Sequence, residues 1–181
     1  MPMFSLPNTL LLVIDVQGNL VPKMRHPQVL IERLKICVQA FQILGVPIIL
    51  TEQVPQKIGS TIMDIARLCP QSPVFEKASF SCFGSPAFVD RLNQTGRRQV
   101  VVAGIETHVC VYQTVCDLLA ARCEVQVVVD AVSSRSERDK HVALHRMKDE
   151  GAKWTTAEMI IIELLKTSEH GKFREVLGLI K

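Results

Sequence analysis

The chain has 181 residues, 48% of them hydrophobic, and a formal net charge of +3 at pH 7. This length and composition predict a single domain, residues 1–181, with enough apolar side chains for a substantial core. The basic residues are scattered rather than gathered into a stripe, which argues against nucleic-acid binding. No apolar run approaches the length of a membrane span, and the first predicted strand begins near Thr9, which leaves no room for a signal peptide.

The cysteines indicate a reducing compartment. There are six, at positions 37, 69, 82, 110, 116 and 123, with no C-x-x-C pair and no zinc-like spacing. Several lie within apolar or helical runs, where a free cysteine behaves as a small hydrophobic residue. We therefore expect a cytoplasmic protein without a disulfide framework.

Strand-like and helix-like patterns alternate along the chain. Apolar, β-branched runs predict strands at residues 10–14, 48–51, 74–75, 100–103 and 125–129, and an edge strand at 153–155. Amphipathic spacing predicts helices at 27–44, 86–93, 107–121, 136–150, 157–166 and 172–179, and a helical turn within 62–68.

Near-continuous apolar strands separated by helices are typical of a parallel sheet that is covered on both faces. The predicted fold class is therefore α/β: a three-layer, Rossmann-like sandwich around a mainly parallel sheet of about six strands. The first strand is not followed by G-x-G-x-x-G, and there is no P-loop, so neither a dinucleotide nor a nucleoside triphosphate is expected.

Three positions at the ends of predicted strands carry reactive groups: Asp15, Lys77 and Cys110. In a parallel sheet all three would face one crevice, where a carboxylate, an ammonium and a thiol form a nucleophilic unit. Cys110 also lies in the first turn of a predicted helix, where unpaired N–H groups and the helix dipole favour a thiolate. Backbone N–H groups at that helix start can receive a developing oxyanion.

Each of these residues also has a purely structural interpretation. An aspartate after a strand commonly caps the following turn, and a lone lysine is usually solvated. A lone cysteine is usually a packed small residue. The coincidence of all three at strand ends is what favours a catalytic site.

The sequence resembles the isochorismatase-like cysteine hydrolases. The resemblance rests on residues 13–17 (VIDVQ), 76–77 (EK) and 104–111 (GIETHVCV), which match the three signature segments of that superfamily in the right order. Residues 51–53 (TEQ), 77–84 (KASFSCFG) and 130–136 (DAVSSRS) look most like the isochorismatase domain-containing subgroup, whose substrates are generally undefined.

The resemblance implies an Asp15–Lys77–Cys110 triad that hydrolyses a small amide or related C–N bond through a thioester. It also implies a non-proline cis peptide between Ile105 and Glu106. In this scheme the backbone N–H groups of Glu106 and Cys110 form the oxyanion hole.

Three further residues are expected in the substrate pocket, namely Gln17, Gln53 and Phe80. Gln53 is the family's match on the second strand, although an ordinary loop glutamine is an equal alternative. Nicotinamidases carry an Asp-x-His metal motif after that strand, where this chain has residues 51–53 (TEQ), which argues against both a metal and nicotinamide as the substrate. We expect no cofactor. Isochorismate lyase-type members lack the cysteine, which argues against isochorismate as the substrate.

The expected partner is a small-molecule substrate, without nucleic acid or membrane. The apolar run at residues 159–165 covers more of a helix than one buried face needs, which predicts a homo-oligomer unless the monomer itself buries it. Two functions from other classes remain open at this point: a non-catalytic interaction module, and a redox-sensing thiol centred on Cys110.

Overall fold

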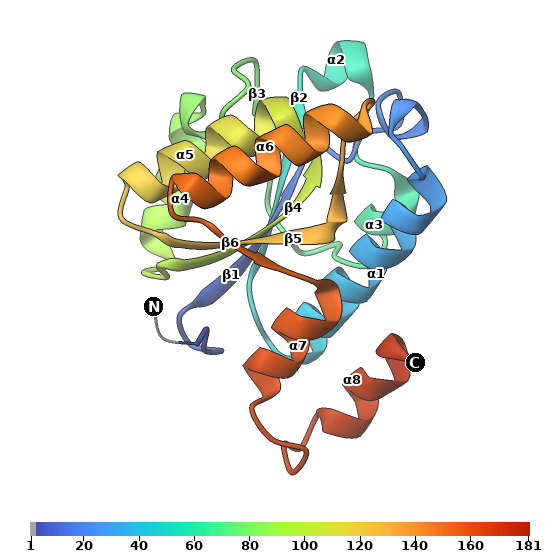
Figure 1. The fold of residues 1–181 in the computed structure, drawn as a ribbon, viewed down its shortest axis with the longest axis vertical. Coiled ribbons are helices and arrows are strands. Elements are labelled where there is room, and N and C mark those ends of the chain that lie inside the picture. Colours follow the sequence, from blue (N-terminus) through green and yellow to red (C-terminus); the bar gives the residue numbers. More distant parts are fainter. Residues whose placement is uncertain (1–2) are drawn as a thin grey trace.

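The computed structural model describes residues 3–181 as a six-stranded sheet with helices on both faces (Figure 1). Every pair of neighbouring strands is parallel, which confirms the predicted α/β sandwich. In chain order the strands are β1 (Thr9–Ile14), β2 (Ile48–Gln53), β3 (Val74–Lys77), β4 (Gln99–Ile105), β5 (Glu124–Ser133) and β6 (Lys153–Thr155).

The helices connect these strands as predicted, with two additional features. They are α1 (Pro27–Ile43), α2 (Pro55–Ile58), α3 (Met63–Ala66), α4 (Pro86–Gln94), α5 (Tyr112–Ala120), α6 (Glu137–Asp149), α7 (Ala157–Leu165) and α8 (Phe173–Ile180). Helix α2 falls in a stretch where the sequence predicts no regular element. The predicted helix at 107–121 begins as a π-helical segment, Thr107–Val111, and only then becomes α5.

The sheet separates two apolar cores, because side chains alternate along each buried strand. Leu11 and Val13 of β1 pack into the layer formed with α1, α3, α7 and α8. Leu10, Leu12 and Ile14 pack into the opposite layer, with α4, α5 and α6. In Figure 1, α5 and α6 lie above the sheet and α1, α7 and α8 lie below it.

The strand order is β3-β2-β1-β4-β5-β6, so the chain reverses its direction of winding between β1 and β4. In open α/β sheets this reversal leaves a crevice beyond the carboxyl ends of the two central strands, and ligands bind there. The fold therefore directs attention to the residues that follow Ile14 and Ile105.

No helix within residues 3–181 combines the length and the apolar character that crossing a lipid bilayer requires.

Candidate functional site

Asp15 and Cys110 lie on either side of the β1–β4 crevice. Asp15 directly follows β1 and adopts a left-handed backbone conformation, with φ of 54°, which turns the chain off the strand. Cys110 lies in the π-helical segment that follows β4. Lys77 is the last residue of β3, two strands away from β1, and its long side chain reaches across to the crevice.

The Lys77 ammonium is buried and fully engaged. Its Nζ donates to Oδ2 of Asp15 at 2.6 Å, to Oε1 of Gln53 at 2.6 Å and to the backbone oxygen of Ser79 at 3.2 Å. An ammonium has three N–H donors, so these contacts use all of them. Lys77 can therefore fix the position and charge of Asp15, but it has no donor left for a ligand while these bonds persist.

The Asp15 carboxylate is held from both sides. Lys77 binds Oδ2, and the Thr51 hydroxyl donates to Oδ1 at 2.8 Å. This carboxylate is also close enough to Cys110 for its negative charge to raise the pKa of the thiol. The structure thus brings together the three residues that the sequence singled out, and it adds Thr51, which the sequence analysis did not identify as a site residue.

The surroundings of Cys110 favour its neutral thiol over the thiolate. Burial raises its pKa well above the ordinary range, the negative charge of Asp15 raises it further, and the positive charge of Lys77 opposes both. This differs from the expected thiolate, because Cys110 is only 5% exposed and faces a carboxylate. A neutral thiol beside a carboxylate is suited to attack in which the base removes the proton as the sulfur reacts.

A cavity of about 330 Å³ opens beside Cys110. Apart from Cys110, half of its lining side chains are apolar and half are polar or charged. The lining residues are Leu20, Lys23, Gln53, Ile58, Phe80, Glu106, Val109, Cys110 and Arg135. This size and mixture fit a small organic ligand with a few fixed polar contacts.

The two glutamines expected in the pocket have different positions. Gln53 lines the cavity, accepts from Lys77, and donates from Nε2 to the backbone oxygen of Ala78 at 2.7 Å. Gln17 does not line it. Its side chain accepts from the Gln53 backbone N–H at 2.7 Å and donates to the Gln53 backbone oxygen at 3.0 Å, so it braces the end of β2. Phe80, the third expected residue, lines the cavity and is half exposed.

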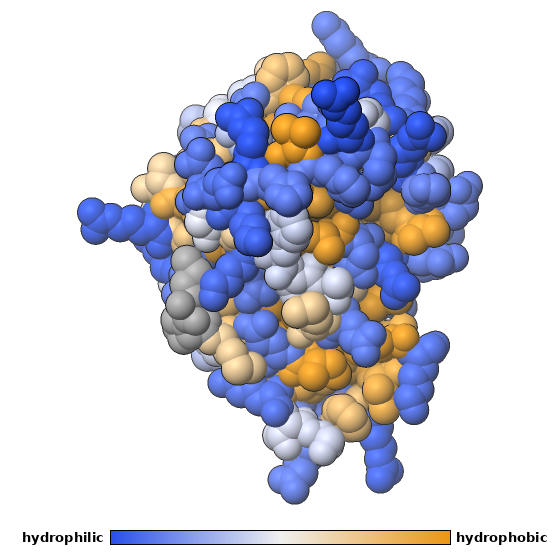
Figure 2. Space-filling view, in the orientation of Figure 1, coloured by the Kyte–Doolittle hydropathy of each residue, from blue (hydrophilic) through white to orange (hydrophobic). Residues whose placement is uncertain are grey.

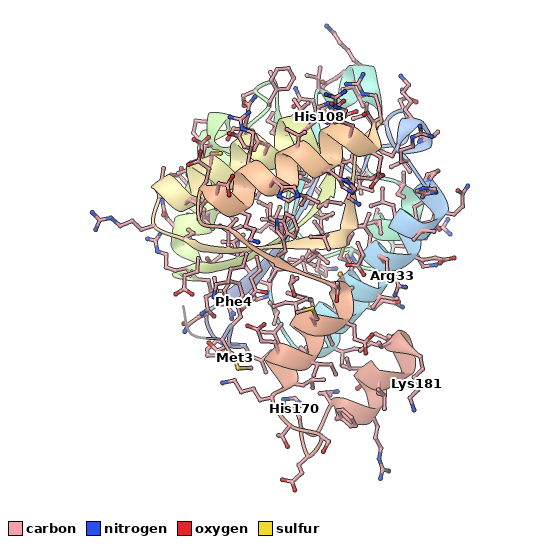
Figure 3. All side chains as sticks on the ribbon, in the orientation of Figure 1. Met3, Phe4, Arg33, His108, His170 and Lys181 are labelled. Atoms are coloured by element: carbon pink, nitrogen blue, oxygen red, sulfur yellow. The ribbon has the colours of Figure 1, made fainter. Side chains whose placement is uncertain are left out.

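Glu106 presents a buried side chain that the sequence analysis did not anticipate. Its Oε1 accepts from Nε of Arg135 at 2.7 Å, whereas its Oε2 is buried and has no hydrogen-bond partner. His108 Nδ1 lies 3.5 Å from that Oε2 and 3.0 Å from the Ser134 hydroxyl. Figure 3 labels His108, and the hydrogen bonds and ion pairs of the described residues join its ring to Ser134 and Glu106 rather than to Cys110.

The expected cis peptide between Ile105 and Glu106 is wrong for this structure, in which all peptide bonds of residues 3–181 are trans. Within β4, Gly104 has a φ of +126°, at the point where the pairing of β4 with β5 shifts its register. A Cβ at Gly104 would lie 2.2 Å from the backbone oxygen of Ile14, so β1 and β4 approach each other more closely here than any side chain allows.

A second cysteine, Cys82, lies close to the site. Its backbone N–H donates to the Thr114 hydroxyl at 3.1 Å, and its sulfur lies 3.8 Å from the Thr51 hydroxyl. Burial raises the pKa of Cys82 to about 11, with the charge of Asp15 a smaller cause. Cys82 is 28 positions from Cys110 and lies in a different connection, so no local pattern predicts that it lies near Asp15.

Glu52, the acidic residue beside Gln53 on β2, already has hydrogen-bond partners. Glu52 accepts from the Thr61 backbone N–H at 2.7 Å and from the Thr61 hydroxyl at 2.8 Å. Among residues 3–181, no three His, Cys, Asp or Glu side chains gather as a metal site would require.

The chain is similar to known proteins over nearly its whole length. The family model of the isochorismatase domain matches residues 9–159. Isochorismatase domain-containing protein 1 of Salmo salar is 39% identical over 171 residues, which cover 92% of this chain and 59% of that protein. The chain thus spans less than two thirds of that relative's length.

Two solved structures share the fold. The MAR1 ribonuclease of Caenorhabditis elegans has a TM-score of 0.94 and 38% identity, with 99% of this chain and 92% of that chain covered. YcaC of Escherichia coli, described as an octameric hydrolase of unknown specificity, has a TM-score of 0.91 at 22% identity, with 99% and 88% covered, and at that identity it shows the fold alone. On the family match and the sequence identity of these relatives, the chain belongs to the isochorismatase family.

Proposed function

We propose that this protein is a cysteine-dependent hydrolase of a small amide or related C–N substrate, acting through a thioester. The observation that carries the proposal is the arrangement of Cys110 and Asp15. A neutral thiol and a carboxylate fixed by Lys77 and Thr51 meet beside a cavity at the crevice of the sheet. Membership of the isochorismatase family supports hydrolase activity in general.

In the first step, Asp15 removes the thiol proton while the Cys110 sulfur attacks the carbonyl carbon. The S–C bond forms, and the carbonyl oxygen becomes an oxyanion that the backbone N–H groups of Glu106 and Cys110 stabilise. Asp15 then passes its proton to the substrate nitrogen, the C–N bond breaks, and an amine leaves. The product of this step is a thioester on Cys110.

In the second step, Asp15 removes a proton from a water molecule as that water attacks the thioester carbonyl. The C–S bond breaks, a carboxylic acid leaves, and the proton returns to the sulfur. Lys77 remains charged throughout and holds Asp15 in place, since all three of its donors are engaged. This scheme uses the neutral thiol as the resting state.

The same features weigh against a redox-sensing thiol. Sensor cysteines are exposed and have a low pKa, so that the thiolate is present at neutral pH. Cys110 is buried and its pKa is raised. An interaction module that works without chemistry would not require Cys110 at all, so a partner pull-down unchanged by Cys110→Ser would favour that alternative.

The Caenorhabditis elegans relative is named a ribonuclease, which suggests RNA as a different substrate. A buried nucleophile in a cavity of about 330 Å³ suits a small molecule better than a polynucleotide strand. We therefore expect no cleavage of a fluorogenic single-stranded RNA above the background of the Cys110→Ala variant.

The decisive experiment is a screen of small primary amides, with ammonia release as the readout and intact-mass spectrometry to trap the thioester. Wild-type protein should release ammonia from at least one amide and gain the acyl mass. Cys110→Ala should do neither, whereas Cys116→Ala, which changes a half-buried thiol on α5, should behave as wild type. An acyl adduct that persists in Cys110→Ala would disprove the proposal.

We also propose a homo-oligomer and a cytoplasmic location. Within the predicted apolar run, Ile160, Ile161, Leu164 and Leu165 are buried in the monomer, which leaves only Met159 and Ile162 exposed. Figure 2 shows the hydrophobic residues over α7 interspersed with hydrophilic ones. The surplus apolar surface is thus smaller than the sequence suggested. Light scattering at micromolar concentration that gives only the 20.2 kDa monomer would reject the oligomer.

The proposed cytoplasmic location agrees with the state of the cysteines. All six are free, as a reducing location requires.

A further inference from the structure

A second cavity, of about 340 Å³, lies where α6 packs against β5 and the edge strand β6. None of its lining residues lines the cavity beside Cys110, so the two spaces are separate. In Figure 1 this is the region where α6 passes above β6. The lining residues are Val129, Lys140, His141, Leu144, His145 and Trp154.

The Trp154 indole forms a fixed apolar wall of this cavity. Its Nε1 donates to the backbone oxygen of Leu144 at 3.0 Å, and the ring of His145 meets it edge to face with centroids 5.0 Å apart. The indole is nevertheless 37% exposed. Because its one polar atom already has a partner, it can offer a ligand apolar surface without losing a hydrogen bond.

The polar side chains that line the cavity are all basic. Lys140, His141 and His145 come from α6, and no acidic side chain is among the lining residues that the structure describes. The acid Glu137 lies one turn earlier on the helix, where its Oε1 is 3.2 Å from Nε2 of His141. A concave site whose polar groups are all basic favours a ligand of negative charge.

Within residues 3–181, the ammonium of Lys140 makes no hydrogen bond and no ion pair, although its side chain is partly buried. The two acids whose charges act on it have other partners: Asp130 accepts a backbone N–H, and Glu137 faces His141. Burial lowers the pKa of Lys140 in spite of these acids. The fold therefore stabilises this cation less than water does, and an anion in the cavity would supply the missing partner.

We propose that this cavity binds a small organic anion with a flat, apolar body, of the class of an aromatic carboxylate. The Lys140 ammonium donates to the carboxylate, and the ring of the ligand packs against the Trp154 indole. The imidazoles of His141 and His145, four residues apart on α6, supply further N–H donors. A volume of about 340 Å³ lies at the small end of ligand cavities, which suits a single ring.

The chain provides its own probe for this site, because Trp154 is its only tryptophan. Tryptophan fluorescence therefore reports on this cavity and not on the one beside Cys110. Benzoate, which has both a ring and a carboxylate, is titrated against the whole chain. Benzyl alcohol has the ring without the charge, and acetate has the charge without the ring. All titrations are made at one ionic strength, so that screening of charge is equal.

Benzoate should change the Trp154 emission in a saturable way and bind at least about tenfold more tightly than benzyl alcohol or acetate, since a hydrogen bond to a charged group is worth that much. Lys140→Gln should weaken benzoate binding by about tenfold and leave that of benzyl alcohol unchanged. Lys57→Gln, which removes the same charge from an exposed position on α2, should bind benzoate like wild type.

Two results would overturn the anion site directly: equal affinity for benzoate and benzyl alcohol in wild type, and an equal loss in Lys140→Gln and Lys57→Gln. Emission that changes with protein concentration alone, together with a larger particle in light scattering, would assign the cavity to a second copy of the chain and also overturn it. Because the inference does not use Cys110, each of these results leaves the hydrolase proposal untouched.

If Lys140→Gln does not fold, quenching of wild-type Trp154 by iodide and by caesium gives the same test. Each quenching constant is divided by that of free N-acetyltryptophanamide, which removes the intrinsic difference between the two ions. A positive cavity concentrates iodide and repels caesium, so iodide should quench more strongly. Equal normalised quenching rejects the anion site.

Discussion

The Nζ of Lys77 lies 2.6 Å from Oδ2 of Asp15, and both side chains are completely shielded from solvent. A buried ion pair of this kind is stable only while both charges are present, because either one alone faces a large desolvation cost. The Asp15–Lys77 pair therefore links the stability of the fold to the candidate site.

Replacement of Lys77 by methionine should destabilise the protein by about 3–5 kcal/mol, because Asp15 would remain buried without its partner. Denaturant unfolding followed by circular dichroism measures this. Lys57→Met removes an exposed lysine from α2 and should change the free energy of unfolding by less than about 0.5 kcal/mol.

The double variant Asp15→Asn/Lys77→Met replaces both charges and should recover much of the lost stability. A Lys77→Met protein within about 1 kcal/mol of wild type would mean that Asp15 is not buried as an ion.

Replacement of Asp15 by asparagine should lower the pKa of the Cys110 thiol. The charge of Asp15 raises that pKa in the native protein, after the larger effect of burial, and Lys77 would remain to stabilise a thiolate. The pH profile of Cys110 alkylation by iodoacetamide should shift to lower pH by about one unit or more. Hydrolase activity should be lost in the same variant, since the base is gone.

Lys77→Met should shift the alkylation profile in the opposite direction. An unchanged profile in Asp15→Asn would show that the carboxylate does not act on the sulfur.

Buried thiols should make the protein less stable at alkaline pH. Burial raises the pKa of Cys37 and Cys110 well above the ordinary range, and that of Cys82 to about 11. In the unfolded chain these thiols ionise near pH 8.5, whereas in the native protein they stay protonated. The free energy of unfolding should therefore fall as pH rises from about 8.5 toward 11, by up to about 1.4 kcal/mol per pH unit for each thiol.

The alkaline effect is tested by denaturant titrations between pH 7 and pH 10.5. Cys37→Ala should reduce the slope of stability against pH above pH 9. Val38→Ala removes a buried apolar group from the same helix and should lower stability equally at every pH. Equal slopes in Cys37→Ala and wild type would rule out ionisation of Cys37 as a cause.

A side chain at Gly104 should not be tolerated. An added Cβ would overlap the backbone of Ile14, and φ of +126° is unfavourable for any residue with a side chain. Gly104→Ala should lose on the order of 4 kcal/mol of stability. Gly178→Ala, in open space on α8, should gain up to about 1 kcal/mol. A soluble Gly104→Ala protein of wild-type stability would show that β1 and β4 can separate at this point.

Catalysis should need no metal. The modification of Cys110 by acrylamide, and the release of ammonia from any amide identified in the screen, should survive exhaustive chelation. Glu52 lies within residues 51–53, where nicotinamidases carry their metal motif. In this structure its carboxylate already accepts two hydrogen bonds from Thr61. Loss of activity on chelation, with recovery on adding one specific metal, would reveal a ligand set that the described side chains do not suggest.

Local pattern was sufficient to predict the sheet. Apolar runs predicted the four central strands β1, β2, β4 and β5, because a strand covered on both faces is largely apolar. The edge strands β3 and β6 are short and partly exposed, and they were predicted from residues 74–75 and 153–155. The sequence also predicted that Asp15, Lys77 and Cys110 lie at strand ends. Parallel strands bring their carboxyl ends to one edge of the sheet. The elements that were missed are short: α2 has four residues and too few apolar positions to show a period.

Charge balance and cavity composition depended on tertiary structure. The sequence predicted a thiolate at Cys110 from the helix start, but the folded protein buries that sulfur beside Asp15, and burial and the carboxylate raise the pKa of the thiol more than Lys77 lowers it. Gln17 was expected in the pocket and instead braces β2, because the direction of a side chain after a strand depends on the turn that follows.

The sequence by itself therefore determined the fold class, the family and the three strand-end residues, since these depend on short-range pattern and on the order of segments. Only the tertiary structure decided which side chains share the cavity. Glu106 and Arg135 come from different connections, 29 positions apart, and their 2.7 Å contact arises because β4 and β5 are neighbours in the sheet. Such a long-range contact leaves no periodic signal in the chain, because its geometry is set by the packing of the whole domain.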